Sequence, residues 1–248
     1  MKTSGNTILI TGATSGIGLA LAERFEAAGN TVVVGGRRRD RLDAIVAEHP
    51  GMGAVELDVA DPASIAAAFD EVTASHPDLN VVITMAGIMQ PEDLHDPAHL
   101  DVAEATIATN LLGTIRTLTA FTPYLAAKPD GVVMTVSSGL AFVPLPMTPT
   151  YNATKAAVHS YTQSLRVQYA DSPLQVIELA PPAVQTTLLG QQSDPSAMPL
   201  DEFVAETMQI LADEPDVEEV LVERVLFLRN AEAEGRHASV LELLSGRH

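Results

Sequence analysis

The sequence predicts a single-domain α/β protein with a mostly parallel sheet and helices on both of its faces. Short runs rich in β-branched residues alternate with longer, alanine-rich runs whose apolar residues have helical spacing. The short runs are apolar almost throughout, as in parallel strands that are buried on both faces. Strict alternation of strand and helix implies right-handed crossovers, and therefore a doubly wound sheet.

Each element follows from this pattern. The expected strands are 7–11, 31–34, 53–57, 81–84, 132–136 and 175–179, with a short last strand at 219–222. The expected helices are 16–28, 39–48, 62–75, 100–124, 151–169 and 200–212, and the chain beyond Val225 is also expected to be helical. The loop 181–199 is rich in Gln, Ser and Pro and long for a compact domain, so it is either disordered or a functional lid. We therefore expect one domain over 1–248, with a substrate lid at about 181–212.

Composition excludes several classes of function. The formal net charge of −18 argues against nucleic-acid binding, which needs basic side chains to replace counterions. There is no cysteine, which excludes disulfides and thiolate metal sites. No secretion signal opens the chain, and no apolar run reaches the roughly 18 residues of a membrane span. We expect a cytoplasmic protein with neither nucleic-acid nor membrane partners.

The first expected strand leads directly into a glycine-rich turn, Thr11-Gly12-Ala13-Thr14-Ser15-Gly16-Ile17-Gly18. Glycine is needed where the chain turns sharply and where backbone must approach an anion. A helix that begins near Gly16 would point free N–H groups and its positive dipole end at a pyrophosphate. The alternative is a tight turn without a ligand. The residues of this turn assigned to cofactor binding are Gly12, Thr14, Ser15, Gly16, Ile17 and Gly18.

Three consecutive arginines follow the second expected strand, where an acidic residue would bind the ribose of NAD(H). Because a guanidinium matches phosphate oxygens, NADP(H) is favoured over NAD(H). Arg37 is the first candidate for the 2′-phosphate and Arg38 the second, whereas Arg39 is expected to start a helix and face solvent. The alternative is a solvated charge run. Asp58 is a candidate for the adenine amino group or a helix cap, although Asp61 is the better placed cap.

Candidate catalytic side chains follow the fifth expected strand. Tyr151 and Lys155 are four residues apart, which places them on one face of a helix. An ammonium near a phenol lowers the phenol pKa from about 10, so Tyr151 could exchange a proton with a substrate oxygen near neutral pH. Ser138 ends a strand and can hydrogen-bond the same oxygen, although it could also merely cap a turn.

As a set, these motifs resemble the short-chain dehydrogenase/reductase family in its compact form, over residues 5–222. The resemblance implies a doubly wound Rossmann fold with a seven-stranded sheet in the order 3-2-1-4-5-6-7. The motifs that carry it are Thr11-Gly12 with Gly16 and Gly18, Asp58-Val59, Ala86-Gly87, Asn110-Leu111-Leu112-Gly113, Ser138, and Tyr151 with Lys155.

The resemblance also implies roles in hydride transfer between the nicotinamide and a carbonyl or alcohol. Tyr151 would be the general acid/base, and Ser138 would orient the reacting oxygen. Lys155 would lower the tyrosine pKa and bind the nicotinamide ribose. Asn110 would hold a water linking Lys155 to solvent, or be an ordinary polar residue within a helix. A homodimer or homotetramer through helices 101–124 and 151–169 is implied as well. Further cofactor contacts implied are Asp58, Val59, Ala86, Gly87, Pro181, Val184 and Thr186, with Tyr151 and Lys155.

Two departures from the family pattern border the expected cofactor site. Thr84-Met85-Ala86-Gly87 stands where the family has Asn-Asn-Ala-Gly, and Met85 cannot donate a hydrogen bond. Pro182 replaces the usual glycine after Pro181, which stiffens the turn beside the nicotinamide. Both put cofactor affinity in question. The stretch from Pro181 to Thr186 is similar to a bacterial branch named after the teichoic-acid D-alanylation cluster.

Candidates for the substrate pocket flank Ser138 or lie in the loop 181–199. They lack Lys and Arg, which favours a small apolar carbonyl or alcohol, although half of them could be core or interface packing. The candidates are Met89, Leu140, Phe142, Val143, Pro144, Met147, Leu188 and Leu189.

Three other functions are less favoured. His95 and His99 are four apart, but Pro97 lies between them and no third ligand is evident, so no metal is expected. A catalytically silent NADP(H)-binding sensor or scaffold is opposed by the intact Ser138, Tyr151 and Lys155. A nucleotide-sugar epimerase or dehydratase is opposed by the short chain that follows the sixth strand.

Overall fold

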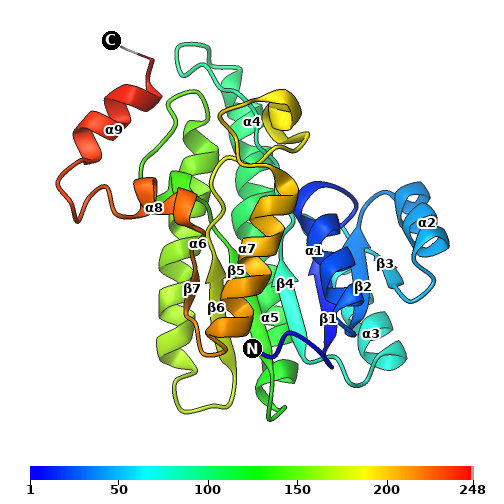
Figure 1. The fold of residues 1–248 in the computed structure, drawn as a ribbon. Coiled ribbons are helices and arrows are strands. Elements are labelled where there is room, and N and C mark those ends of the chain that lie inside the picture. The colour runs from blue at the N-terminus through cyan, green and yellow to red at the C-terminus, as the bar shows by residue number, and fades with distance from the viewer. Residues whose placement is uncertain (247–248) are drawn as a thin grey trace.

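The computed structural model describes residues 1–246, and in this range a central sheet is covered by helices on both faces (Figure 1). The described chain forms seven parallel strands in the order β3-β2-β1-β4-β5-β6-β7, which confirms the predicted fold class and strand order. Residues 247–248 of the expected domain lie outside the described range. The strands are β1 Thr7–Thr11, β2 Thr31–Gly36, β3 Gly53–Glu56, β4 Val81–Thr84, β5 Val132–Val136, β6 Gln175–Leu179 and β7 Glu219–Val220.

The helices follow the predicted alternation. They are α1 Gly16–Ala27, α2 Arg39–Glu48, α3 Pro62–Ser75, α4 His99–Thr106, α5 Gly113–Ala126, α6 Pro149–Gln168, α7 Leu200–Asp213, α8 Glu223–Arg229 and α9 His237–Leu244. Helices α1, α2 and α7 pack on one face of the sheet, while α3, α5 and α6 pack on the other. Among the described helices, none is both long and apolar enough to span a membrane.

Alternate residues of the central strands supply the two halves of the core. Ile8 and Ile10 of β1 face α1 and α7, whereas Leu9 between them faces the side of α3 and α5. All three side chains have no exposed surface. Burying one such side chain contributes about 1.5–3 kcal/mol, so packing on both faces of the sheet stabilises the fold.

The helix predicted over 100–124 is interrupted. A π-helical turn, Ile107–Leu112, separates α4 from α5, and it contains the buried Asn110. The Thr114 hydroxyl donates to the Asn110 carbonyl over 2.8 Å, which satisfies an acceptor at the irregular turn. Such turns are commonly found at functional sites. The spacing of apolar residues over 100–124 predicted one continuous helix and did not indicate this interruption.

The segment 181–212 has two parts. Helix α7 buries Phe203, Val204 and Leu211 in the main core, so residues 200–212 are held as firmly as the other core helices. The preceding irregular stretch contains a 3-10 turn, Leu188–Ser193, in which Leu189 has a φ of 52°. The substrate lid predicted at about 181–212 stays a prediction; its irregular part is 181–199, and the remainder is the core-packed helix α7.

The chain beyond Val225 is helical in two pieces, α8 and α9, joined by a turn at 230–236. Val240 of α9 packs against Ala231 and Val143, forming a small cluster separate from the two main halves of the core. Figure 1 shows α9 in red, projecting from the body of the domain beside α8. This cluster attaches the C-terminal helices to the loop that follows β5.

Candidate active site

Two adjoining cavities lie at the carboxyl edge of the sheet, where open α/β sheets bind ligands. The first, about 340 Å³, is a groove over the glycine-rich turn. The second, about 310 Å³, lies over the end of β5 and the start of α6. Five residues line both cavities, so a ligand in one would border the other; they are Ile17, Met85, Gly87, Thr186 and Leu188.

The glycine-rich turn depends on close backbone contact. Gly12 has a φ of 69°, and a Cβ there would lie 2.6 Å from the Cα of Ala86. A Cβ on Gly18 would lie 2.7 Å from the Gly12 carbonyl oxygen. Ser15 caps α1 without a side-chain hydrogen bond, so the first N–H groups of the helix remain free to bind an anion. The turn therefore fits a pyrophosphate.

The three consecutive arginines lie in different environments, as their positions in the sequence predict. Arg37 and Arg38 both line the groove. The Arg38 Nη2 donates to the Thr14 hydroxyl over 2.6 Å and to the Ser15 hydroxyl over 3.2 Å. Arg39 instead pairs with Asp43 at 3.4 Å on α2, with 72% of its side chain exposed. Arg37 and Arg38 thus border the groove, and Arg39 faces solvent as predicted.

Residues after β3 form another wall of the groove. Asp58 and Val59 line it, and an Asp58 oxygen accepts a hydrogen bond from the Ala60 N–H over 2.9 Å. Asp61 caps α3 by accepting from the Ala63 N–H, so it is the helix cap as predicted. Asp58 therefore does not cap the helix, and its carboxylate borders the groove.

Tyr151, Ser138 and Lys155 come together around the second cavity. Their exposed fractions are only 8%, 6% and 5%. Lys155 Nζ lies 5.6 Å from the centroid of the Tyr151 ring and donates to the Val136 carbonyl over 2.7 Å. Ser138 also accepts a hydrogen bond from the Leu140 N–H over 3.1 Å, so it does cap a turn while facing the cavity.

Burial controls the ionisation of this site. It raises the pKa of Tyr151 to about 12, although a hydrogen bond with Ser138 acts in the opposite direction. Burial also lowers the pKa of Lys155 to about 8, although the negative charge of Glu178 acts to raise it. The lowered tyrosine pKa predicted from the Tyr-Lys spacing was therefore wrong in direction, because desolvation of the phenolate is the larger effect.

Asn110 lies beside Lys155. A Cβ on Gly87 would lie 3.4 Å from the Asn110 Oδ1 and 3.9 Å from the Lys155 Nζ, so Gly87 lies against both side chains. The Asn110 amide donates to the Ile88 carbonyl, and its oxygen accepts from the Ile88 N–H, each over 2.8 Å. Asn110 therefore fixes the chain that follows β4.

The remaining predicted cofactor residues border the two cavities. Ala86 and Gly87 line the groove, and the Ala86 N–H donates to the Thr11 hydroxyl over 3.1 Å. Pro181 and Val184 line the second cavity. Thr186 lines both and lies opposite Gly16, 3.6 Å from where a Cβ would be.

Only part of the predicted substrate pocket lines the second cavity. Met89, Leu140 and Leu188 do. Val143 is instead wholly buried against the C-terminal helices, and Met147 is 46% exposed. The prediction missed Leu145, Gln191 and Asp194, which lie in the two segments considered but belong to no motif. It also missed Leu228 and Leu244, which reach the cavity from the C-terminal helices by long-range packing.

Comparisons with known proteins agree with this geometry. Residues 6–197 match the family model described as short chain dehydrogenase. The chain therefore belongs to the short-chain dehydrogenase/reductase family, as predicted, and is an NAD(P)-dependent oxidoreductase of that family.

One relative narrows the assignment within the family. The chain is 37% identical over 237 residues to the uncharacterized oxidoreductase DltE of Bacillus subtilis (strain 168), with 93% of each protein covered. This agrees with the predicted resemblance to the D-alanylation branch.

Two solved structures share the fold. A short chain dehydrogenase from Burkholderia cenocepacia J2315 in complex with NADP has a TM-score of 0.84 and 27% identity, covering 99% of this chain and 100% of its own. A 3-ketoacyl-(acyl-carrier-protein) reductase from Brucella melitensis complexed with NADH has a TM-score of 0.78 and 26% identity, covering 89% and 97%. These two structures contain NADP and NADH, respectively.

Proposed function

We propose that this protein is an NADP(H)-dependent reductase or dehydrogenase of a small apolar carbonyl or alcohol, with Tyr151 as its general acid/base. The observation that carries the proposal is the convergence of Tyr151, Ser138 and Lys155 on one apolar cavity that adjoins the dinucleotide groove. Among described residues lining that cavity, Lys155 is the only Lys or Arg, which disfavours anionic substrates.

The residues of the groove fit the parts of a dinucleotide. The glycine-rich turn and the start of α1 would hold the pyrophosphate. Asp58 and Val59 would contact the adenine end, while Ala86, Gly87, Pro181, Val184 and Thr186 would border the nicotinamide end. When bound, the nicotinamide supplies the hydride or accepts it.

The proton belongs to Tyr151. A phenol with a raised pKa is protonated at neutral pH, which is the form needed to donate to a carbonyl oxygen during reduction. Ser138 would hydrogen-bond the same oxygen and orient it. Lys155 would stabilise the phenolate that remains and bind the nicotinamide ribose. Asn110 would keep the chain at Gly87 and Ile88 in place beside Lys155, where a water could return the proton.

Arg37 and Arg38 support a preference for NADP(H). Both line the groove, as Asp58 does, and the adenosine ribose would lie beside them. A 2′-phosphate would find two guanidinium groups there and no carboxylate directly after β2.

The loop 181–199 would close over the substrate. The protein would also form a homodimer or homotetramer through the helices of 101–124 and 151–169, where Ile107 and Leu112 of the π-helical turn and Val167 of α6 are exposed.

Replacement of Tyr151 by Phe tests the proposal. We expect the variant to bind NADPH as the unmutated protein does, because the ring still fills its site, while turnover falls by about 10²–10⁴-fold. The measurement is NADPH oxidation against a panel of small aldehydes and ketones, with NADPH binding followed by fluorescence. Comparable turnover in the variant would overturn the role of Tyr151. Tight NADPH binding without turnover on any member of the panel would favour a sensor or scaffold.

A further inference from the structure

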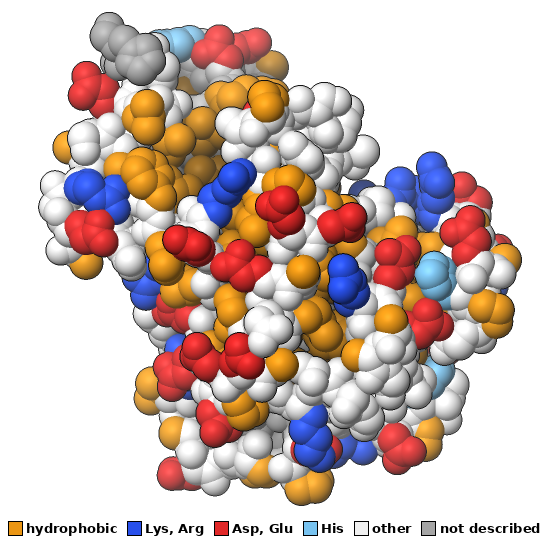
Figure 2. Space-filling model, in the orientation of Figure 1, with side chains coloured by type: hydrophobic (Ala, Val, Ile, Leu, Met, Phe, Trp, Pro, Cys, Tyr) orange, Lys and Arg blue, Asp and Glu red, His pale blue; other side chains and the backbone are white. Residues whose placement is uncertain are grey.

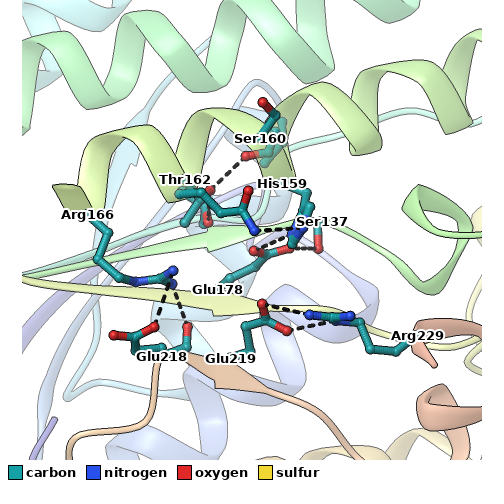
Figure 3. Close-up of polar contacts among 12 residues, drawn as sticks. Ser137, His159, Ser160, Thr162, Arg166, Glu178, Glu218, Glu219 and Arg229 are labelled. Carbon is teal, nitrogen blue, oxygen red and sulfur yellow. Dashed lines mark hydrogen bonds and ion pairs between the residues drawn. The ribbon is translucent and has the colours of Figure 1, made fainter. Parts of the chain in front are cut away.

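A polar cluster adjoins the second cavity, with two buried members and one partly buried member. It consists of Ser137, His159 and Glu178, and we call it the Glu178 cluster (Figure 3). Glu178 lies on β6, Ser137 follows β5, and His159 lies on α6. The beginning of α6 carries Tyr151 and Lys155, so the helix connects this cluster to the catalytic side chains.

Glu178 is an unusual residue for the centre of a sheet. It has no exposed surface, and its neighbours on β6, Ile177 and Leu179, are wholly buried apolar residues. Burying a carboxylate is strongly unfavourable unless donors surround it. The Ser137 hydroxyl donates to one carboxylate oxygen. The His159 Nδ1 lies 2.9 and 2.8 Å from the two oxygens. The fold therefore maintains a charge that an apolar residue could replace.

The Glu178 cluster shares two structural elements with the catalytic groups. Ser137 lies between Val136, whose carbonyl accepts from Lys155 Nζ over 2.7 Å, and Ser138. The Lys155 ammonium thus holds Val136 at the end of β5, and the Glu178 carboxylate holds Ser137 directly after it. On α6, Tyr151, Lys155 and His159 recur every four residues, which places them along one face of the helix.

The carboxylates of Glu219 and Glu178 differ in how fully positive partners neutralise them. Glu219 on β7 is paired in bidentate fashion with Arg229 of α8, at 2.8 and 3.1 Å. Ligand atoms of His159, Glu178 and Glu219 lie within 4.8 Å of one another, but Arg229 already neutralises Glu219. The partners of Glu178 are instead a neutral hydroxyl and an imidazole, so part of its negative charge acts on Lys155.

The imidazole has several charged neighbours. Hydrogen bonding to Glu178 raises the pKa of His159; desolvation opposes this, Glu219 supports it and Arg229 opposes it. Gln163, one turn further along α6, lies 3.2 Å from the His159 Nε2, and the Phe142 ring packs edge-on against the imidazole at 4.8 Å. His159 therefore screens Glu178 from solvent on this side and partly balances its charge.

We propose that Glu178 is a positioning residue for the proton transfer at Tyr151: through Ser137 it fixes the end of β5, whose Val136 carbonyl holds the Lys155 Nζ, and its buried carboxylate favours the charged ammonium. This inference rests on the proposed function. Since burial favours the neutral amine, Lys155 would lose its proton at a lower pH without the carboxylate. A neutral lysine stabilises the phenolate less, so activity would then decline at a lower pH.

The first test measures Lys155 directly, without substrate. The chain has three lysines, Lys2, Lys128 and Lys155, so ¹³C-lysine NMR gives few signals, which Lys2→Arg and Lys128→Arg variants assign. In Glu178→Gln, which keeps the shape and a hydrogen-bond acceptor, we expect the Lys155 pKa to fall by about one unit. Ser137→Ala removes the hydroxyl but keeps the charge, and should leave this pKa nearly unchanged.

An unshifted Lys155 titration in folded Glu178→Gln, with folding checked by thermal unfolding and NADPH binding, would overturn the proposal. Should Glu178→Gln not fold, His159→Gln replaces the test. His159→Gln keeps the Glu178 carboxylate and places a neutral amide donor where the imidazole was. The pKa of Lys155 should therefore stay the same or rise. A fall in this pKa would contradict the proposal.

The second test uses activity. We expect the pH at which kcat declines on the alkaline side to move down by the same amount in Glu178→Gln, and to stay unmoved in the matched Glu219→Gln. A uniform loss of kcat with no movement in pH would indicate a merely structural role and overturn the proposal. The lysine titration needs no turnover, so it stands even where an active Tyr151→Phe variant has overturned the proposed function.

Discussion

The two cavities at the carboxyl edge of the sheet differ in what forms their walls. The groove is formed by turns and backbone at the ends of β1 to β4, where Gly12 and Gly18 allow contacts that a side chain would block. The second cavity is formed by apolar side chains from distant parts of the chain, including Leu140, Leu188 and Leu228. Figure 2 shows hydrophobic side chains, in orange, around the hollow between the C-terminal helices and the body of the domain.

This difference has a functional consequence. A site built from backbone recognises features that all nicotinamide dinucleotides share, and it tolerates few substitutions. A site built from side chains can change its shape one residue at a time, because part of its lining comes from loops and C-terminal helices outside the two main halves of the core. Cofactor binding and substrate choice should therefore respond differently to mutation.

The most severe effect is expected where backbone approaches backbone. In Gly12→Ala, the added Cβ would lie 2.6 Å from the Ala86 Cα, and the residue would be held at a φ of 69°. Overpacking costs about 1–3 kcal/mol and the left-handed conformation roughly 1–2 more, so we expect a loss of about 2–5 kcal/mol in unfolding free energy. NADPH binding should be lost as well. Urea unfolding and NADPH fluorescence measure the two effects.

Gly29→Ala is the matched control. Gly29 has a φ of 85°, but a Cβ there would meet nothing within 4 Å. It should lose only the conformational part, about 1–2 kcal/mol, and keep its NADPH affinity. Equal losses of stability in the two variants would mean that contact with Ala86 is unimportant.

The glycine-rich turn was predictable from sequence because its requirements are local. Gly12, Gly16 and Gly18 follow a strand and open a helix within a few residues, so spacing alone specifies the geometry. The same holds for Tyr151 and Lys155, which one helix carries. Their ionisation was not predictable, since it depends on burial by segments far away in sequence.

The next effect in size concerns the arginines. In the double variant Arg37→Ala/Arg38→Ala, we expect NADPH affinity to fall by about 10–100-fold and NADH affinity to change little, because a charged hydrogen bond contributes about 1.5–3 kcal/mol. The measurement is the ratio of Kd values for the two cofactors. Arg39→Ala is the control, since Arg39 pairs with Asp43 outside the groove. Equal affinities for both cofactors in the unmutated protein would contradict the role of the arginines.

The lining of the second cavity, unlike the glycine-rich turn, was predicted only in part, because its residues come from distant parts of the chain. Val143, expected to line it, instead packs against Ala231 and Val240, while Leu228 and Leu244 reach the cavity from helices near the C-terminus. Leu228 fits beside Gly139, where a Cβ would lie 2.8 Å from its Cδ1. Nothing in the local spacing of these residues indicates which face of α8 or α9 meets the loop after β5.

The smallest expected effect measures what helix α9 contributes to the second cavity. In Leu244→Ala, we expect kcat/KM for an apolar carbonyl to fall by about 10-fold, because a few buried methyl groups contribute about 1–2 kcal/mol of contact with substrate. NADPH affinity should not change, since Leu244 lines only the second cavity. Kinetics with substrates of increasing apolar size, together with NADPH Kd values, measure both.

Leu243→Ala is the control for that variant, because Leu243 lies next to it on α9 with 53% of its surface exposed. It should leave kcat/KM unchanged for every substrate. The loss in Leu244→Ala should also grow with the apolar size of the substrate, since only larger molecules would reach the C-terminal wall. A loss that is equal for all substrates, or that appears in NADPH affinity, would show instead that α9 supports the whole site, and that the two cavities do not respond independently.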